Sequence, residues 1–224
     1  MATVARTLPP ASKRATSGDA EPRVALFNIP WDTYLSLVKA NGEGPVRFTY
    51  DRGMLEIMTL SRYHERLSRF LHRLVGALSE ELGIEICSTG ATTMHSDKLQ
   101  RGAEADESFY IRHESLVRGH GREDFDPASP PDMAVEIDLS SDSSRRLPIY
   151  SALGIPEVWR YDGRRLTFQA LRRGGNYHLV KRSLSFPKLA AADLERFLDK
   201  YDLIGESALV RQFRQWVRET MLPE

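Results

Sequence analysis

Two acidic residues stand on separate segments that we predict to be β-strands. Asp106 lies in GAEADESFYI and Glu136 lies in PPDMAVEIDLSS. If the strands are neighbours, the two carboxylates converge, and hard divalent cations such as magnesium prefer oxygen ligands of this kind. Carboxylates about 4 Å apart repel by roughly 4 kcal/mol, so a close pair needs a cation or a shared proton. The pair is therefore a candidate metal site, although the spacing leaves open that both acids face solvent.

The segment at residues 130–141 alternates apolar and acidic side chains. Met133, Val135, Ile137 and Leu139 predict one buried face, and Asp132, Glu136 and Asp138 share the other. An acidic side chain near a core is costly unless it is hydrated, paired or bound to a metal. The alternation therefore raises the question of what this acidic row faces.

Two basic side chains are candidates to assist the acidic pair. His64 precedes Leu67 by three residues and Leu71 by seven on a predicted helix, so its side chain points toward the core. It could orient a carboxylate or bind substrate, or it could be a structural hydrogen-bonding group. Arg145 and Arg146 follow the acidic strand, where a guanidinium could bind a phosphate oxygen or form an ordinary surface salt bridge.

Several elements must position these residues. Apolar residues at helical spacing predict a helix over 61–82 that ends at Gly83. Alternating segments around Asp51-Arg52-Gly53 predict an N-terminal hairpin, and those around Gly174-Gly175-Asn176 a later one. A short helix that Pro148 limits or bends separates the acidic strand from the strand PEVWRYD. Amphipathic helices are expected in AADLERFLDKYD and ESALVRQFRQWVRET.

Composition limits the class of protein. The 224 residues include 31 Lys plus Arg and 31 Asp plus Glu, so no net charge attracts nucleic acid or a membrane. Cys87 is the only cysteine, which excludes an internal disulfide and fits a cytoplasmic protein. No apolar run approaches the roughly 20 residues that span a bilayer. We expect residues 1–22 to form a flexible tail and residues 23–224 to form one domain.

Basic residues gather in the region of the later hairpin. A DNA backbone could dock there through phosphate contacts, or the residues could form a solvated rim. Trp159 and Tyr161 beside them are expected to be part of the sheet core. The basic residues are Arg160, Arg164, Arg165, Arg172, Arg173, Lys181 and Arg182.

The order of four segments resembles a known family. YHERL, EADESFYI, PPDMAVEIDLSS and RRLPIYSALGIPEVWRYDG follow one another as in the Uma-type restriction endonucleases of the PD-(D/E)XK nuclease superfamily, from about Ile29 to Phe186. The resemblance implies an α/β, restriction-endonuclease-like mixed β-sheet flanked by α-helices, with an N-terminal hairpin and C-terminal helices. It also implies that Asp106 and Glu136 hold magnesium, with manganese as a substitute, for phosphodiester hydrolysis.

The sequence departs from the family pattern at the expected lysine. Two residues after Glu136 stands Asp138, and the later position where similar sequences carry lysine is Arg146. Arginine keeps the charge but does not release a proton near neutral pH. We therefore expect either a magnesium-dependent DNA endonuclease, with Asp106, Glu136, Arg146 and His64 as its site and a homodimer for duplex cleavage, or an inactive DNA-binding or protein-interaction domain that kept the fold.

Overall fold

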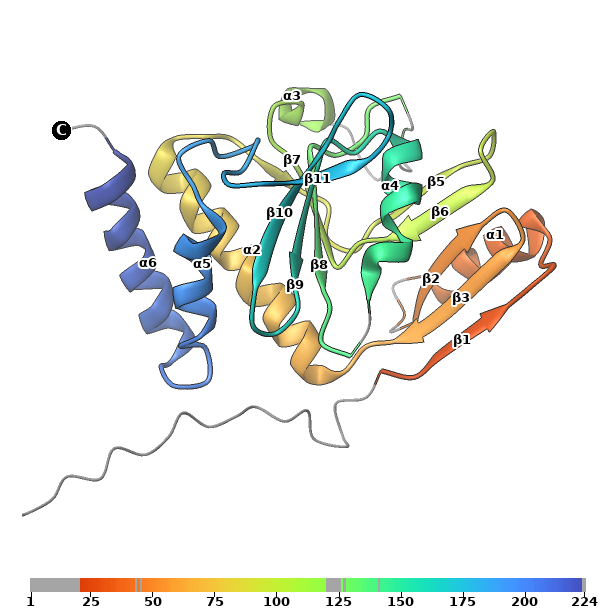
Figure 1. Ribbon diagram of the computed structural model, residues 1–224, viewed down its shortest axis with the longest axis horizontal. Helices are drawn as coiled ribbons and strands as arrows, with labels where there is room; N and C mark the ends of the chain where they lie inside the picture. Colours follow the sequence, from red (N-terminus) through yellow and green to blue (C-terminus); the bar gives the residue numbers. More distant parts are fainter. Residues whose placement is uncertain are drawn as a thin grey trace, which may run out of the picture.

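The computed structural model describes residues 21–42, 44, 46–119, 126, 128–140 and 142–222, which fold into two β-sheets flanked by helices (Figure 1). The larger sheet has six strands, in the spatial order β11 (Tyr177–Val180), β10 (Leu166–Leu171), β9 (Glu157–Tyr161), β8 (Met133–Ile137), β7 (Glu107–Tyr110) and β4 (Cys87–Ser88). Its β8–β9 pair is parallel and its other pairs are antiparallel, so this sheet is mixed, as expected.

A second, antiparallel sheet contains the N-terminal hairpin. Its five strands lie in the order β1 (Arg23–Leu26), β3 (Met54–Thr59), β2 (Val46–Asp51), β6 (Arg101–Glu104) and β5 (Thr93–Ser96). Helix α1 (Trp31–Asn41) packs on it through Tyr34, and Pro30 is the residue that precedes the helix. The hairpin turn at Arg52-Gly53 has positive φ at both positions. The division into two sheets is the main difference from the single sheet that the resemblance implied.

Helix α2 (Arg62–Leu82) confirms the most regular sequence pattern. The Ser61 side chain accepts a hydrogen bond from the His64 backbone N–H, and Gly83 adopts the left-handed conformation that ends the helix. The apolar stripe of α2 packs against one face of the larger sheet. Because His64 belongs to the first turn of that stripe, its side chain is aimed inward and is only 1% exposed.

Strand β8 is buried on both sides, so the acidic side chains of residues 132–138 point into the protein and not into solvent. Met133, Val135 and Ile137 point toward α2, while Ala134 belongs to a second core on the side of α4 (Leu147–Leu153). Glu136 shares the face of Ala134 and is 1% exposed. The alternative that the acidic residues face solvent is therefore wrong, because α4 and the smaller sheet cover that side (Figure 1).

The β8–β9 crossover consists of η1 (Ser143–Arg145) and α4. Pro148 is the second residue of α4, where a missing N–H breaks no helical hydrogen bond, so it begins the helix and does not bend it. Gly154 ends α4 at φ 83°, in the left-handed region. The crossover thus brings Arg146, at the junction of η1 and α4, back over the acidic strand.

The later hairpin forms as expected, but it does not gather the basic residues into one surface. Arg164 and Arg165 lie in the β9–β10 turn, whereas Arg172 and Arg173 lie in the β10–β11 turn. These turns are at opposite ends of β10, which is about 20 Å long at 3.3 Å per residue. Arg160 forms an ion pair with Asp138 and is therefore not available for the hairpin surface. Trp159 and Tyr161 are core residues, as expected.

The C-terminal helices complete the core on the α2 side of the larger sheet. Helix α5 (Ala191–Leu198) lies against β10, and α6 (Glu206–Met221) packs along α2 (Figure 1). The short helix α3 (Glu114–Val117) follows β7. Within the described part of the chain, no helix is long and apolar enough to cross a membrane.

The α2–α6 contact predicts a small acid sensitivity. Hydrogen bonds from Arg218 and Arg214 lower the pKa of Glu81 to about 2. A lowered folded-state pKa stabilises the protein above the unfolded pKa, and that stability is lost as the pH falls from about 4.5 toward 2. We expect the wild type to lose up to about 1 kcal/mol more than Glu81→Gln in acid. Urea unfolding of the wild type and Glu81→Gln between about pH 5 and 2 measures this difference, and Glu219→Gln is the control. The prediction is contradicted if the wild type and Glu81→Gln lose the same free energy of unfolding over this pH range.

Candidate active site

The acidic pair converges because β7 and β8 are neighbours. Glu107 pairs with Val135 in antiparallel register, and the Asp106 N–H donates to the Val135 carbonyl at 3.1 Å. The strand pairing ends there, and Asp106 lies beside the start of β7, close enough to Glu136 for its charge to raise the pKa of that carboxyl. Both residues are at most 5% exposed. The two carboxylates that the sequence singled out are therefore both buried, and each affects the other's electrostatic environment.

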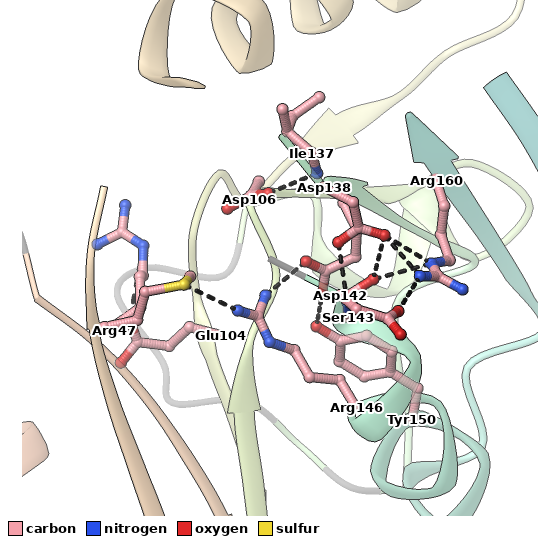
Figure 2. Close-up of polar contacts among 12 residues, drawn as sticks. Arg47, Glu104, Asp106, Ile137, Asp138, Asp142, Ser143, Arg146, Tyr150 and Arg160 are labelled. Carbon is pink, nitrogen blue, oxygen red and sulfur yellow. Dashed lines mark hydrogen bonds and ion pairs between the residues drawn. The ribbon is translucent and has the colours of Figure 1, made fainter. Parts of the chain in front are cut away.

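Both oxygens of Glu136 are engaged by residues from the crossover. Arg146 Nη1 lies 2.5 Å from Glu136 Oε2, and the Tyr150 hydroxyl donates to Glu136 Oε1 (Figure 2). Arg146 and Tyr150 are four residues apart, one turn along the chain, so both reach the same carboxylate. The Arg146 side chain is 5% exposed. Arg146 therefore forms a buried ion pair, whereas the sequence left open a phosphate contact or a surface salt bridge.

His64 lies between two carboxylates. Its Nε2 is 2.9 Å from Asp106 Oδ1, and its Nδ1 is 2.6 Å from Glu21 Oε1. These distances are short, but the ring N–H directions miss the oxygens, so both contacts are ion pairs and not aligned hydrogen bonds. Asp106 Oδ2 accepts the Ile137 N–H at 2.7 Å. Asp106 is thus fixed by β8 on one side and by α2 on the other.

Charges within the site set its protonation states. Burial lowers the pKa of His64, but Asp106 and Glu21 outweigh it and raise that pKa to about 10. Burial raises the pKa of Asp106, but the neighbouring His64 charge brings it below its ordinary value. Burial also raises the pKa of Glu136, and here Arg146 only partly opposes it. His64 is therefore an imidazolium at neutral pH and cannot accept a proton from water.

The other acids of the β8 row have structural partners. Asp138 accepts hydrogen bonds from the backbone and side chain of Ser143 and pairs with Arg160 at 2.6 Å (Figure 2). Asp132 accepts from the backbone N–H groups of Ile111 and His113. These contacts hold the start of η1 and the end of β7, so neither acid is a free ligand.

The two carboxylates are chemically suited to a hard cation, but the Arg146 guanidinium already occupies the place beside Glu136. Asp106 Oδ1 is a buried acceptor without a hydrogen bond from any described residue. Among the residues that the structure describes, no group of three or more His, Cys, Asp or Glu has the arrangement of a metal site. Two carboxylates are few for magnesium, which usually completes its shell with water and substrate phosphates. Asp106 and Glu136 could hold such an ion once Arg146 leaves Glu136.

Removal of the Tyr150 hydroxyl tests how tightly Glu136 is held. In Tyr150→Phe the buried Oε1 loses its donor, and we expect unfolding by urea to show a loss of about 1–3 kcal/mol. Tyr177→Phe, which removes a hydroxyl bonded to the Ile155 carbonyl, is the control and should lose about 0.5–1.5 kcal/mol. A Tyr150→Phe protein as stable as the wild type would contradict the assigned contact.

Two contributors to the site were not found from the sequence. Glu21 lies in the stretch that we expected to form a tail, yet it is 7% exposed and also bonds to Ser140 through its backbone and side chain. Residues 1–20 of that expected tail lie outside the described residues. The Tyr150 hydroxyl also escaped notice. For Tyr150, a signal was present, because it lies one helical turn after Arg146; for Glu21, no local pattern indicated burial.

Comparison with known protein families places most of the chain within a family model. Residues 31–199 match the family Uma2, described as "Putative restriction endonuclease". This range covers more than half of the chain and contains His64, Asp106, Glu136 and Arg146, whereas Glu21 lies before it. A search of curated proteins finds no match.

Proposed function

This chain belongs to the Uma2 family, and from that premise we propose that it is a magnesium-dependent endonuclease that hydrolyses DNA phosphodiester bonds. The family relationship supports a nuclease, and nucleases with this kind of fold are typically metal-dependent. The observation that carries the proposal is that Asp106 and Glu136 are both buried beside the junction of two neighbouring strands, where the charge of Asp106 raises the pKa of Glu136. Buried acidic side chains are costly unless they are paired, and carboxylate oxygens are also the ligands that a hard divalent cation prefers.

Asp106 and Glu136 would hold the metal in this proposal. A bound magnesium or manganese ion supplies Lewis-acid stabilisation of phosphate charge and lowers the pKa of a bound water. His64, fixed at 2.9 Å from Asp106, keeps that carboxylate ionised and oriented. Arg146 keeps its proton at any relevant pH, so its role is to stabilise negative charge on phosphate after it leaves Glu136.

A surface depression near η1 is where we propose that the DNA backbone approaches. Its volume is about 320 Å³, and it opens beside the crossover that carries Arg146. Arg145 is exposed there and can contact a phosphate directly, because the split basic hairpin offers no single surface. The depression is lined by Arg23, Ala25, Glu56, Asp142 and Arg145.

A rival function is favoured by one observation. Because Arg146 already neutralises Glu136, the domain could bind DNA or protein without cleaving anything, as expected for a nuclease fold that lost its lysine. Such a domain would retain DNA in a salt-sensitive way, since phosphate contacts release counterions whether or not chemistry follows. Cleavage is therefore the property that separates the two functions.

Nicking of supercoiled plasmid tests the proposal. We expect the purified protein to convert supercoiled to open-circular DNA in Mg²⁺ or Mn²⁺ and to stop when EDTA is added. Salt-sensitive DNA binding without nicking at any metal concentration would support the rival function instead.

The proposal includes a homodimer, because cutting both strands of a duplex at one place takes two such centres. Light scattering measures the oligomeric state. A cytoplasmic location is also proposed, from the single cysteine.

A further inference from the structure

Arg146 occupies the place that a cation would take beside the acidic pair. Its Nη1 is 2.5 Å from Glu136 Oε2, and its Nη2 lies 3.9 Å from the sulfur of Met58 on β3. The side chain is 5% exposed and is held between the two sheets (Figure 2). The guanidinium is therefore a buried, ion-paired part of the site and not an exposed surface group.

The chain balances the charge of the acidic pair by itself. Asp106 and Glu136 bring two negative charges, His64 stands beside the first, and Arg146 stands beside the second. A divalent cation entering this site gains less than it would from an uncompensated pair, because it must first displace a charged, hydrogen-bonded partner. Arginine cannot give up its proton to make room, so it must move as a whole.

The guanidinium also blocks Glu136 geometrically. Since the Tyr150 hydroxyl takes Oε1 and Arg146 takes Oε2, both oxygens are engaged, whereas Asp106 Oδ1 has no hydrogen-bond donor. A cation would thus meet the His64 imidazolium 2.9 Å from Asp106 Oδ1, but at Glu136 it would find both oxygens engaged by hydrogen-bond donors. Glu136 is opened by removing Arg146 alone, since Tyr150 leaves the other lone pairs of the carboxylate accessible.

We propose that Arg146 is a built-in competitor for the divalent metal, so that the wild type binds Mg²⁺ and Mn²⁺ weakly and loss of the guanidinium strengthens binding. The inference rests on the metal-binding role proposed for Asp106 and Glu136, but it does not depend on DNA cleavage. It makes Arg146 a determinant of metal affinity, a role separate from any contact with phosphate.

Titration with Mn²⁺ alone, followed by calorimetry and by the electron paramagnetic resonance signal of free Mn²⁺, tests the inference. We expect Arg146→Met to bind Mn²⁺ at least about tenfold more tightly than the wild type, which corresponds to about 1.4 kcal/mol. Arg69→Met, which changes an arginine whose side chain is 79% exposed, should bind like the wild type. The double variant Glu136→Gln/Arg146→Met should lose the gain, because the opened ligand is Glu136.

A second variant, Arg146→Gln, tests the inference in case Arg146→Met does not fold. Arg146→Gln keeps a hydrogen-bond donor for Glu136 without the charge, and Mn²⁺ should raise its melting temperature more than that of the wild type. The inference is overturned if neither variant binds Mn²⁺ more tightly than the wild type, or if the gain survives in the Glu136→Gln double variant. Tighter Mn²⁺ binding by the variants without any plasmid nicking by the wild type would support the inference and contradict the proposed nuclease function. Plasmid nicking by the wild type without tighter Mn²⁺ binding by the variants would support the nuclease function and contradict the inference.

Discussion

Replacing Glu136 with alanine is expected to lower the free energy of unfolding by about 3–5 kcal/mol. The cause is the Arg146 guanidinium, which would stay buried at 5% exposure without the carboxylate that now lies 2.5 Å away. An uncompensated buried charge costs more than the ion pair contributes, so removing both partners should be less harmful than removing one. Urea unfolding of Glu136→Ala, Arg146→Met and the double variant measures this directly.

The control for this prediction is the cost of Glu136→Ala measured in two backgrounds, the wild type and Arg146→Met. In the Arg146→Met background, Glu136→Ala should cost much less than in the wild type, giving a coupling energy of roughly 1–3 kcal/mol. Asp142→Ala, at a side chain that is 69% exposed, should change stability by less than about 1 kcal/mol. Equal costs of Glu136→Ala in both backgrounds would show that the two side chains do not form a buried pair.

Replacing Asp106 with asparagine is expected to reduce metal-dependent plasmid nicking by about 1,000-fold or more, equivalent to about 4 kcal/mol of transition-state stabilisation. Asparagine keeps an oxygen for the Ile137 N–H, which Asp106 now accepts at 2.7 Å, but it loses the charge that a hard cation requires. His64 would still face Glu21 at 2.6 Å, so the helix remains anchored. The loss should therefore come from the chemistry and not from unfolding.

Asp97→Asn is the matched control for this loss. It removes the same kind of charge from a side chain that is 76% exposed and lies outside the proposed site, and its nicking rate should stay within about threefold of the wild type. Circular dichroism and melting temperature verify that both variants are folded. An Asp106→Asn protein that nicks plasmid as fast as the wild type would remove Asp106 from the metal site.

Local patterns were enough to predict most elements. The stripe from Leu67 to Leu82 and the stop at Gly83 determine α2, and alternation around Arg52-Gly53 determines the first hairpin, because both depend on residues close in the chain. The division into two sheets was not predictable in this way. It depends on β6 pairing with β2 across some fifty residues, and no local pattern specifies which distant strands pair.

The candidate site was predictable in part for the same reason. Helical phase alone turned His64 inward, and the acidic alternation identified Glu136. The burial of Glu136 on both sides was missed, because a strand covered by helices on both faces can still show alternation when its second face carries paired charges. The partner of Arg146 was also missed, since the crossover geometry and not the spacing decides whether that side chain turns inward or toward solvent.

A crystal structure of Arg146→Met soaked in manganese, with an anomalous difference map, is the most direct measurement of how the acidic pair works. The predicted result is a manganese peak within coordination distance of both Asp106 and Glu136, with Arg69→Met crystals showing a weaker peak at the same place. No peak there, or a peak that contacts only one of the two carboxylates, would contradict a shared metal site at the meeting point of β7 and β8.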